Sequence, residues 1–151
     1  HNPFFSSQTD DPPTPSAYSL LSHDCAWALE SVGLDSYVGF LHRDRPGRNS
    51  LALDLMEEFR PCVADRFVLT CINNRVFQKS DFVCRENGGV LLSEGGRRTF
   101  LQRWQERKKD SLTHPFLGEK VPWGLVPYLQ ALLLARYLRG DLDAYPPFLW
   151  K

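Results

Sequence analysis

The feature that most constrains the fold is a long helical pattern in the middle of the chain. Its apolar side chains recur every fourth position and form one stripe: Leu51, Leu55, Phe59 and Val63. The pattern predicts a helix over residues 51–73. Pro61 lies inside it, and because proline lacks a backbone donor and clashes with the preceding turn, we expect the helix to kink or divide there. A chain built on such an element is predicted to be mainly α.

Three further helices are expected around this one. The first begins near Ser16 and ends before Gly33, since glycine accepts the left-handed backbone of a helix end. A helix with Ser93 as its N-cap extends to about residue 112, and the last helix covers residues 122–138.

The remaining segments are short. Residues 82–92 are predicted to form one small β-hairpin, because Asn87, Gly88 and Gly89 at their centre accept positive φ. Residues 1–15 form an irregular N-terminal segment interrupted by four prolines. Residues 16–151 are interpreted as one helical domain, whose tail after Gly140 packs as an extended strap.

Charge and cysteine usage exclude several classes of protein. The chain has 18 Lys and Arg against 18 Asp and Glu, so its formal net charge is zero and any DNA site must be a local patch. Its four cysteines include no C-x-x-C pair, which argues against a zinc ribbon and fits the reduced thiols of a cytoplasmic protein. No signal peptide is visible, and polar residues interrupt the longest apolar stretch, so no membrane span is expected.

Three acidic residues follow the start of the long helical pattern. Because Asp54, Glu57 and Glu58 are three and four positions apart, their side chains project from adjacent turns. Glu58 is expected closer to the apolar stripe, which leaves Asp54 and Glu57 as the outward pair. Two fixed carboxylates offer the oxygen ligands that Mg²⁺ or Mn²⁺ takes, and one added imidazole shifts the preference toward Mn²⁺.

His42 is the candidate imidazole. It precedes a loop with Pro46 and Gly47 that can fold back over the following helix. A divalent ion there would serve phosphoryl transfer, by neutralising a phosphodiester and activating the attacking hydroxyl or water. Arginines of the same loop could hold phosphate oxygens: Arg43, Arg45 and Arg48.

Each of these features also has a structural explanation, which is the commoner one on spacing alone. Acidic residues near a helix start are usually solvated and interact favourably with the helix dipole. A lone histidine is more often a surface group. His114 has no evident ligand partner and is interpreted as structural, and the adjacent His23, Asp24 and Cys25 point in different directions on a helix.

Two further features leave the function open. One side of the helix after Ser93 is basic and could bind DNA or be solvated: Arg97, Arg98, Arg103, Arg107, Lys108 and Lys109. In a non-catalytic helical module that binds another protein, three tryptophans would be interface anchors rather than core residues: Trp104, Trp123 and Trp150.

Several ordered segments resemble the CRISPR-associated integrase family Cas1. The segments GLD (33–35), VGFLH (38–42) and SLALDLMEEFRP (50–61) are similar to its core signature. The later segments THPFLGEKVPWGL (113–125) and LRGDLDAYPPFLW (138–150) resemble its type I-C branch. The likeness extends from about Ser19 to Lys151, and ordered motifs over that length are far more specific than one carboxylate pair.

The resemblance implies a helical catalytic domain, preceded in the family by a β-rich dimerisation domain that this chain does not contain. It implies a metal held by a glutamate, a histidine and a second acid. His42 matches the histidine, Glu57 the second acid, Asp54 a nearby acidic position, and Arg60 a basic position that faces DNA. The family's first glutamate lies upstream of the matched region, whereas the first glutamate here is Glu30, so the metal site is expected to be incomplete.

The expected fold is therefore mainly α, with one small β-hairpin and without the family's N-terminal β domain. The resemblance implies a metal-dependent DNA endonuclease or integrase that uses Mg²⁺ or Mn²⁺ and inserts short double-stranded DNA into a CRISPR array by transesterification. It implies as partners this DNA, the Cas2 protein, in this branch often a Cas4 nuclease, and a second copy in the full-length protein. The alternative is the non-catalytic interaction module.

Overall fold

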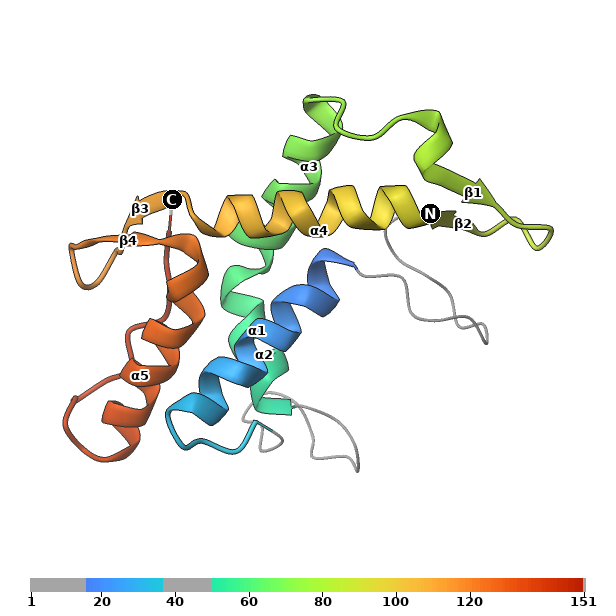
Figure 1. Ribbon diagram of the computed structural model, residues 1–151. Coiled ribbons are helices and arrows are strands. Elements are labelled where there is room, and N and C mark those ends of the chain that lie inside the picture. The colour runs from blue at the N-terminus through green and yellow to red at the C-terminus, as the bar shows by residue number, and fades with distance from the viewer. Residues whose placement is uncertain (1–15, 37–49, 151) are drawn as a thin grey trace.

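The computed structural model describes residues 16–36 and 50–150, and in this part of the chain helices predominate (Figure 1). The α-helices are α1 (Ala17–Ser31), α2 (Ser50–Phe59), α3 (Arg66–Asn73), α4 (Glu94–Lys108) and α5 (Val126–Leu138). A π-helical segment, Arg60–Asp65, joins α2 to α3, and two short 3-10 turns lie at Lys79–Asp81 and Trp123–Leu125. The strands are β1 (Phe82–Cys84), β2 (Val90–Leu92), β3 (Ser111–Thr113) and β4 (Lys120–Pro122).

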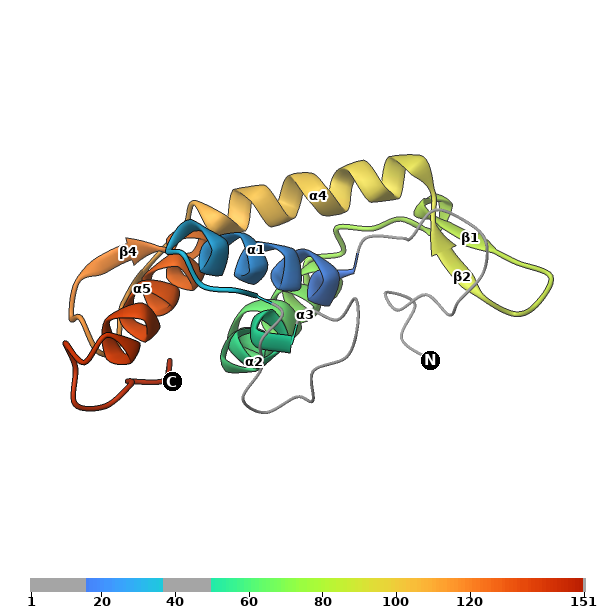
Figure 2. The same ribbon diagram turned by 90° about the horizontal axis from the view of Figure 1, so that it is seen from below.

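Helix α1 packs against both α2 and α5. Its start is a capping box in which Ser16 Oγ accepts the Ser19 amide and Ser19 Oγ receives the Ser16 amide. Its buried face follows helical spacing: Ala17, Leu21, Cys25, Ala28 and Leu29. Helix α4 runs along one side of the molecule, with a β-hairpin near each of its ends (Figure 2).

The division at Pro61 is confirmed. Helix α2 ends at Phe59, and the chain continues through the π-helical segment into α3 without leaving helical geometry. A proline lacks the amide that would bond to the preceding turn, so the ladder widens locally and then resumes. The predicted helices over 16–33 and after Ser93, and the hairpin over 82–92, are also confirmed.

The prediction of a single hairpin is wrong, because the described residues contain two. In the second one, Ser111 pairs with Pro122, Leu112 with Val121, and Thr113 with Lys120. The helix after Ser93 therefore ends at Lys108 rather than near residue 112, and α5 begins at Val126 rather than at 122. The strands β3 and β4 have three residues each, which is too short to show an alternating pattern.

Aromatic side chains make up much of the core. Phe67 makes edge-to-face contacts with Phe100 and Trp104 at 5.4 and 5.0 Å between ring centroids. The C-terminal strap (residues 145–150) has no regular secondary structure and inserts Phe148, only 4% exposed, among other rings. The predicted strap is therefore confirmed, and Phe148 is its anchor.

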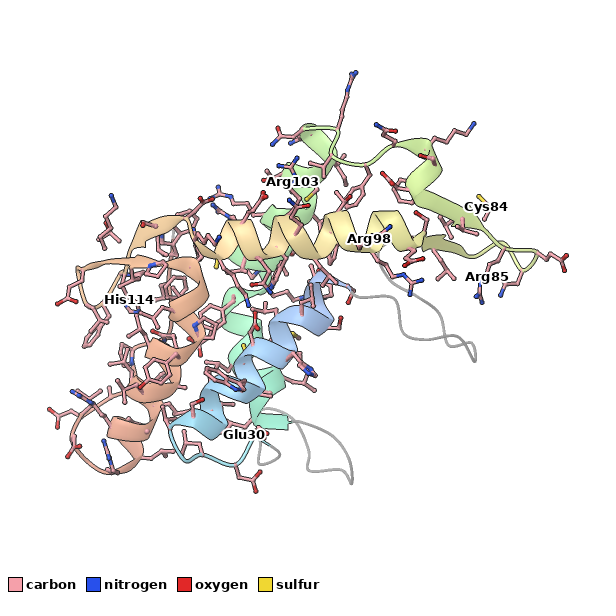
Figure 3. All side chains as sticks on the ribbon, in the orientation of Figure 1. Glu30, Cys84, Arg85, Arg98, Arg103 and His114 are labelled. Carbon is pink, nitrogen blue, oxygen red and sulfur yellow. The ribbon has the colours of Figure 1, made fainter. Side chains whose placement is uncertain are left out.

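The four cysteines are all free. Cys25 and Cys71 are buried, Cys62 is half-buried, and Cys84 is exposed on β1 (Figure 3). In the two described stretches, no helix combines the length and apolar character that crossing a lipid bilayer requires.

Candidate metal centre

The predicted site residues divide into two groups. His42, Arg43, Arg45 and Arg48 lie outside the described residues, so the meeting of the imidazole with the carboxylates stays a prediction. The acidic residues lie on α2, and Arg60 begins the segment that follows it.

The carboxylates of α2 share one cavity of about 410 Å³ between α2, α5 and the strap. Its lining includes Asp54, Glu57 and Glu58 together with Leu134 and Tyr145. The three acids are thus brought together, as their spacing predicts. The expected outward direction of both Asp54 and Glu57 is only half right, because Asp54 is 9% exposed whereas Glu57 is exposed.

Glu57 faces Arg60 one turn later. The distance from Arg60 Nη1 to Glu57 Oε1 is 3.5 Å, and both side chains are nearly half exposed, so the pair contributes little to stability. The Arg60 guanidinium also lies 4.7 Å from the centre of the Tyr18 ring. Arg60 is therefore held beside the carboxylates but remains open to solvent.

The first turn of α2 is fixed by a contact that the sequence did not reveal. The backbone oxygen of Ser36 accepts the amides of Leu51 and Ala52 at 2.8 and 3.2 Å, which satisfies two donors at the helix start. Ser36 is buried, and its hydroxyl donates to Glu30 Oε1 at 3.2 Å (Figure 3). The end of α1 therefore positions the turn that carries Asp54.

Glu58 has a different role from its neighbour Glu57. It accepts hydrogen bonds from the Phe148 amide at 2.7 Å, from the Tyr145 hydroxyl at 2.7 Å and from Gln130 Nε2 at 3.2 Å. Burial raises the pKa of Glu58, and these three hydrogen bonds oppose that effect because they favour the charged form. No motif pointed to this residue, since its partners lie 72 to 90 positions away.

A second cavity of about 460 Å³ adjoins the first on the other side of the strap. It is lined by Glu57 and Glu58 as well, and by Arg66 and Trp150. The Arg66 guanidinium lies 4.9 Å from the centre of the Trp150 ring. Glu57 thus lines two neighbouring cavities.

The other sequence candidates are structural. His114, predicted to be so, is 1% exposed and bonds to Gln130 (Figure 3). Asp24 accepts from Lys108 Nζ at 2.9 Å and from Trp104 Nε1 at 3.4 Å. Burial raises the pKa of the Cys25 thiol well above its usual value, so Cys25 is not an activated nucleophile.

The basic side expected on α4 is not continuous. Arg98 and Arg103 extend from different sides of the helix (Figure 3). Three of its cations are in ion pairs with acids: Arg103 with Glu106, Arg107 with Asp110, and Lys108 with Asp24. Two of the supposed interface anchors are core residues, since Trp104 and Trp123 are 3% and 5% exposed.

The described residues fit part of a divalent-cation site. Asp54 and Glu57 supply the hard oxygen ligands that Mg²⁺ and Mn²⁺ prefer, one from a sheltered position and one from an open cavity. Within residues 16–36 and 50–150, no cluster of three or more His, Cys, Asp or Glu side chains is arranged to hold a metal. A third ligand would have to come from elsewhere, as the prediction for His42 requires.

A family model described as "CRISPR associated protein Cas1" matches residues 17–106, more than half of the chain. The chain belongs to the Cas1 family. It is 63% identical over 134 residues to the "CRISPR-associated endonuclease Cas1 2" of Rhodospirillum rubrum. This match covers 89% of this chain and 39% of that relative. It is 43% identical to a "CRISPR-associated exonuclease Cas4/endonuclease Cas1 fusion" of Geobacter sulfurreducens, over 89% of this chain and 24% of the fusion. This chain therefore spans well under half the length of these Cas1 relatives.

Solved structures agree with the Cas1 fold. The structure described as "Casposase bound to integration product" superposes with a TM-score of 0.77 at 33% identity, over 89% of this chain and 40% of the casposase. A chain of a "Partial Cas6-RT-Cas1--Cas2 complex" gives a TM-score of 0.69 at 23% identity, over 97% of this chain and 45% of that one. The second likeness shows the fold alone.

Proposed function

We propose that this chain is the catalytic portion of a type I-C Cas1 integrase, which inserts short DNA duplexes into a CRISPR array. The observation that carries the proposal is the pairing of Asp54 and Glu57 in one cavity, in a chain of the Cas1 family. The branch is supported by the segments at residues 113–125 and 138–150.

In the proposed site, His42, Glu57 and Asp54 hold Mg²⁺ or Mn²⁺. An ion held there would supply charge neutralisation at the phosphodiester and would activate the attacking hydroxyl. Glu57 provides a ligand from the open cavity, and Asp54 provides one from its sheltered position. The remaining ligand expected for the family, a glutamate upstream of this chain, would complete the set.

The proposed reaction is a transesterification. The 3′-oxygen of the incoming strand forms a bond to an array phosphorus, and the bond from that phosphorus to the array's own 3′-oxygen breaks. Arg60 lies beside Glu57 and is half exposed, so it is placed to contact backbone phosphate. Arg43, Arg45 and Arg48 are proposed to do the same from the loop that carries His42.

The proposed partners are double-stranded DNA, Cas2, Cas4 and a second copy of the full-length protein. The casposase named as bound to an integration product supports the DNA partner. The complex whose name joins Cas1 and Cas2 supports Cas2, and the Cas4–Cas1 fusion supports a Cas4 nuclease. A cytoplasmic location is part of this proposal, because its DNA substrates lie there.

Strand transfer tests the proposal directly. In a chimera, the N-terminal portion of the Rhodospirillum rubrum Cas1 protein would be fused to the start of this chain. The chimera would be incubated with labelled duplex, array DNA and Mn²⁺. We expect Mn²⁺-dependent joining that His42→Ala and Glu57→Ala reduce by at least about 100-fold, because each removes a ligand. Asp54→Ala should also reduce it.

Two controls separate chemistry from folding. Glu106→Gln changes an exposed acid on α4 whose side-chain partners are Arg103 and Gln102, and it should leave strand transfer unchanged. Circular dichroism of the ligand variants should match that of the parent. A chimera that folds and neither binds Mn²⁺ nor joins DNA would contradict the proposed function.

A further inference from the structure

A buried polar network lies next to the proposed metal ligands and contains none of them. Its members come from four parts of the chain: His114 after β3, Gln130 on α5, Glu58 on α2, and Tyr145 of the strap. His114 and Gln130 are at most 1% exposed. Polar groups buried in this way must be hydrogen-bonded, so their geometry is tightly specified.

The direction of the network can be read from His114. Its Nδ1 accepts the amides of Phe116 and Leu117, each at 3.1 Å, so Nδ1 carries no hydrogen. The ring hydrogen is therefore on Nε2, which donates to Gln130 Oε1 at 2.8 Å. This fixes the orientation of the Gln130 amide.

With its oxygen turned to His114, Gln130 can only donate toward α2 and the strap. The two hydrogens on its Nε2 are shared among three acceptors: Glu58 Oε1 at 3.2 Å, Tyr145 Oη at 2.9 Å and the Pro146 oxygen at 3.1 Å. Glu58 also receives the Tyr145 hydroxyl and the Phe148 amide. An ionised carboxylate that accepts three such hydrogen bonds has its oxygens committed to the protein.

The strap in turn forms walls of both cavities that Glu57 lines. Pro147 contributes to each of them. Glu57 and Glu58 are consecutive on one helix, so a rotation of α2 that releases Glu58 must also turn Glu57. The network therefore holds the turn that carries Glu57 and the cavity walls that surround it.

We infer that Glu58 is a positioning residue, which clamps the strap onto α2 and so keeps Glu57 and Asp54 in the geometry that binds the cation. This inference rests on the proposed function, in which those two carboxylates bind a divalent ion. Glu58 itself is not a ligand.

Two substitutions at one position test the inference in the 151-residue chain. Glu58→Leu removes every acceptor while keeping an apolar side chain of similar length. Glu58→Gln keeps Oε1, which accepts from Gln130, Tyr145 and Phe148. Glu106→Gln serves as the matched control on an exposed acid.

Two readouts are measured on each variant. The affinity for Mn²⁺ is measured from the paramagnetic resonance signal of free Mn²⁺. The attachment of the strap to α2 is measured from the hydrogen-exchange rate of the Phe148 amide. We expect Glu58→Leu to weaken Mn²⁺ binding by about tenfold and to speed exchange, since partners that orient ligands affect affinity by about 10–100-fold. Glu58→Gln and Glu106→Gln should stay close to the parent in both.

The outcomes separate the alternatives. If Glu58→Leu loosens the strap and leaves Mn²⁺ affinity unchanged, the clamp is merely structural and the inference is wrong. If Glu58→Gln abolishes Mn²⁺ binding while the strap stays protected, Glu58 is a ligand and the inference is also wrong. If the parent chain and the chimera both fail to bind Mn²⁺, the proposed function fails, whatever the exchange data show.

Discussion

At the scale of single residues, two adjacent glutamates on α2 have opposite environments. Both line the two cavities, but Glu57 is exposed, whereas Glu58 is hydrogen-bonded to Gln130, Tyr145 and Phe148. Burial beside the Glu58 charge also raises the pKa of the Tyr145 hydroxyl well above its usual value, so Tyr145 acts only as a neutral donor. Glu57 is therefore accessible to a ligand, whereas Glu58 links α2 to α5 and the strap.

Thiol labelling tests the burial at this scale. Cys84 is exposed and should react first with a disulfide reagent, whereas Cys25 should react only when the molecule opens, since it is fully buried and its pKa is raised by that burial. Burial raises the pKa of Cys62 to about 11, so its thiolate fraction and labelling rate should rise about tenfold from pH 8 to pH 9.

The variant Cys84→Ser shows which phase of the labelling reaction belongs to Cys84. It should remove the fast phase of labelling and leave the slow ones unchanged. Rapid reaction of Cys25 in the native protein would contradict the packing of α1 described above.

Helical spacing predicted that Asp54 and Glu57 lie close together, and both line one cavity, while their role as metal ligands stays a prediction. It could not find the role of Glu58, because the partners of that side chain are brought to it only by the tertiary fold. It also placed Asp54 outward with Glu57, although Asp54 is buried, since the packing of α5 and the strap against α2 is not visible in local periodicity.

Among the elements, the helices and the hairpin over residues 82–92 were predictable, whereas the hairpin of β3 and β4 was not predicted. Ser16 and Ser93 cap α1 and α4 as expected, because a hydroxyl before an apolar pattern satisfies free amides of the first turn. Strands β3 and β4 pair over three residues each, and their pairing is set by a turn in which the His114 amide bonds to the Glu119 oxygen. Pro115 and Gly118 lie in this turn, and Gly118 has a φ of +71°, so a turn signal was present although no hairpin was predicted there.

Alanine substitutions at two neighbouring glycines at the start of α4 are expected to change the stability of the fold in opposite directions. A Cβ on Gly96 would lie 2.7 Å from the backbone oxygen of Asp81, so Gly96→Ala should destabilise the fold by about 1–3 kcal/mol. A Cβ on Gly95 would meet only the Ser93 hydroxyl oxygen at 3.9 Å, so Gly95→Ala should stabilise it by about 0.5–1 kcal/mol. Urea unfolding of the two variants measures both values.

Each variant is the control for the other, because both add the same methyl group to the same helix turn. Equal effects of the two substitutions would show that α4 does not pack against the 3-10 turn Lys79–Asp81 as described.

At the scale of the whole molecule, α1, α2, α5 and the strap together build the candidate site. The end of α1 fixes the start of α2 through Ser36, and α5 and the strap hold its second turn through Glu58. The zero net charge gives no general attraction to DNA, so the proposed DNA binding would depend on local basic groups.

The central claim is that His42 and Glu57 share one divalent ion. Anomalous diffraction at the manganese edge, from crystals of this chain grown with Mn²⁺, tests it most directly. We expect one strong peak within about 2–2.3 Å of an imidazole nitrogen of His42 and a carboxylate oxygen of Glu57, with Asp54 beside it. An ordered His42 ring on another side of the molecule, with no peak at Glu57, would contradict it.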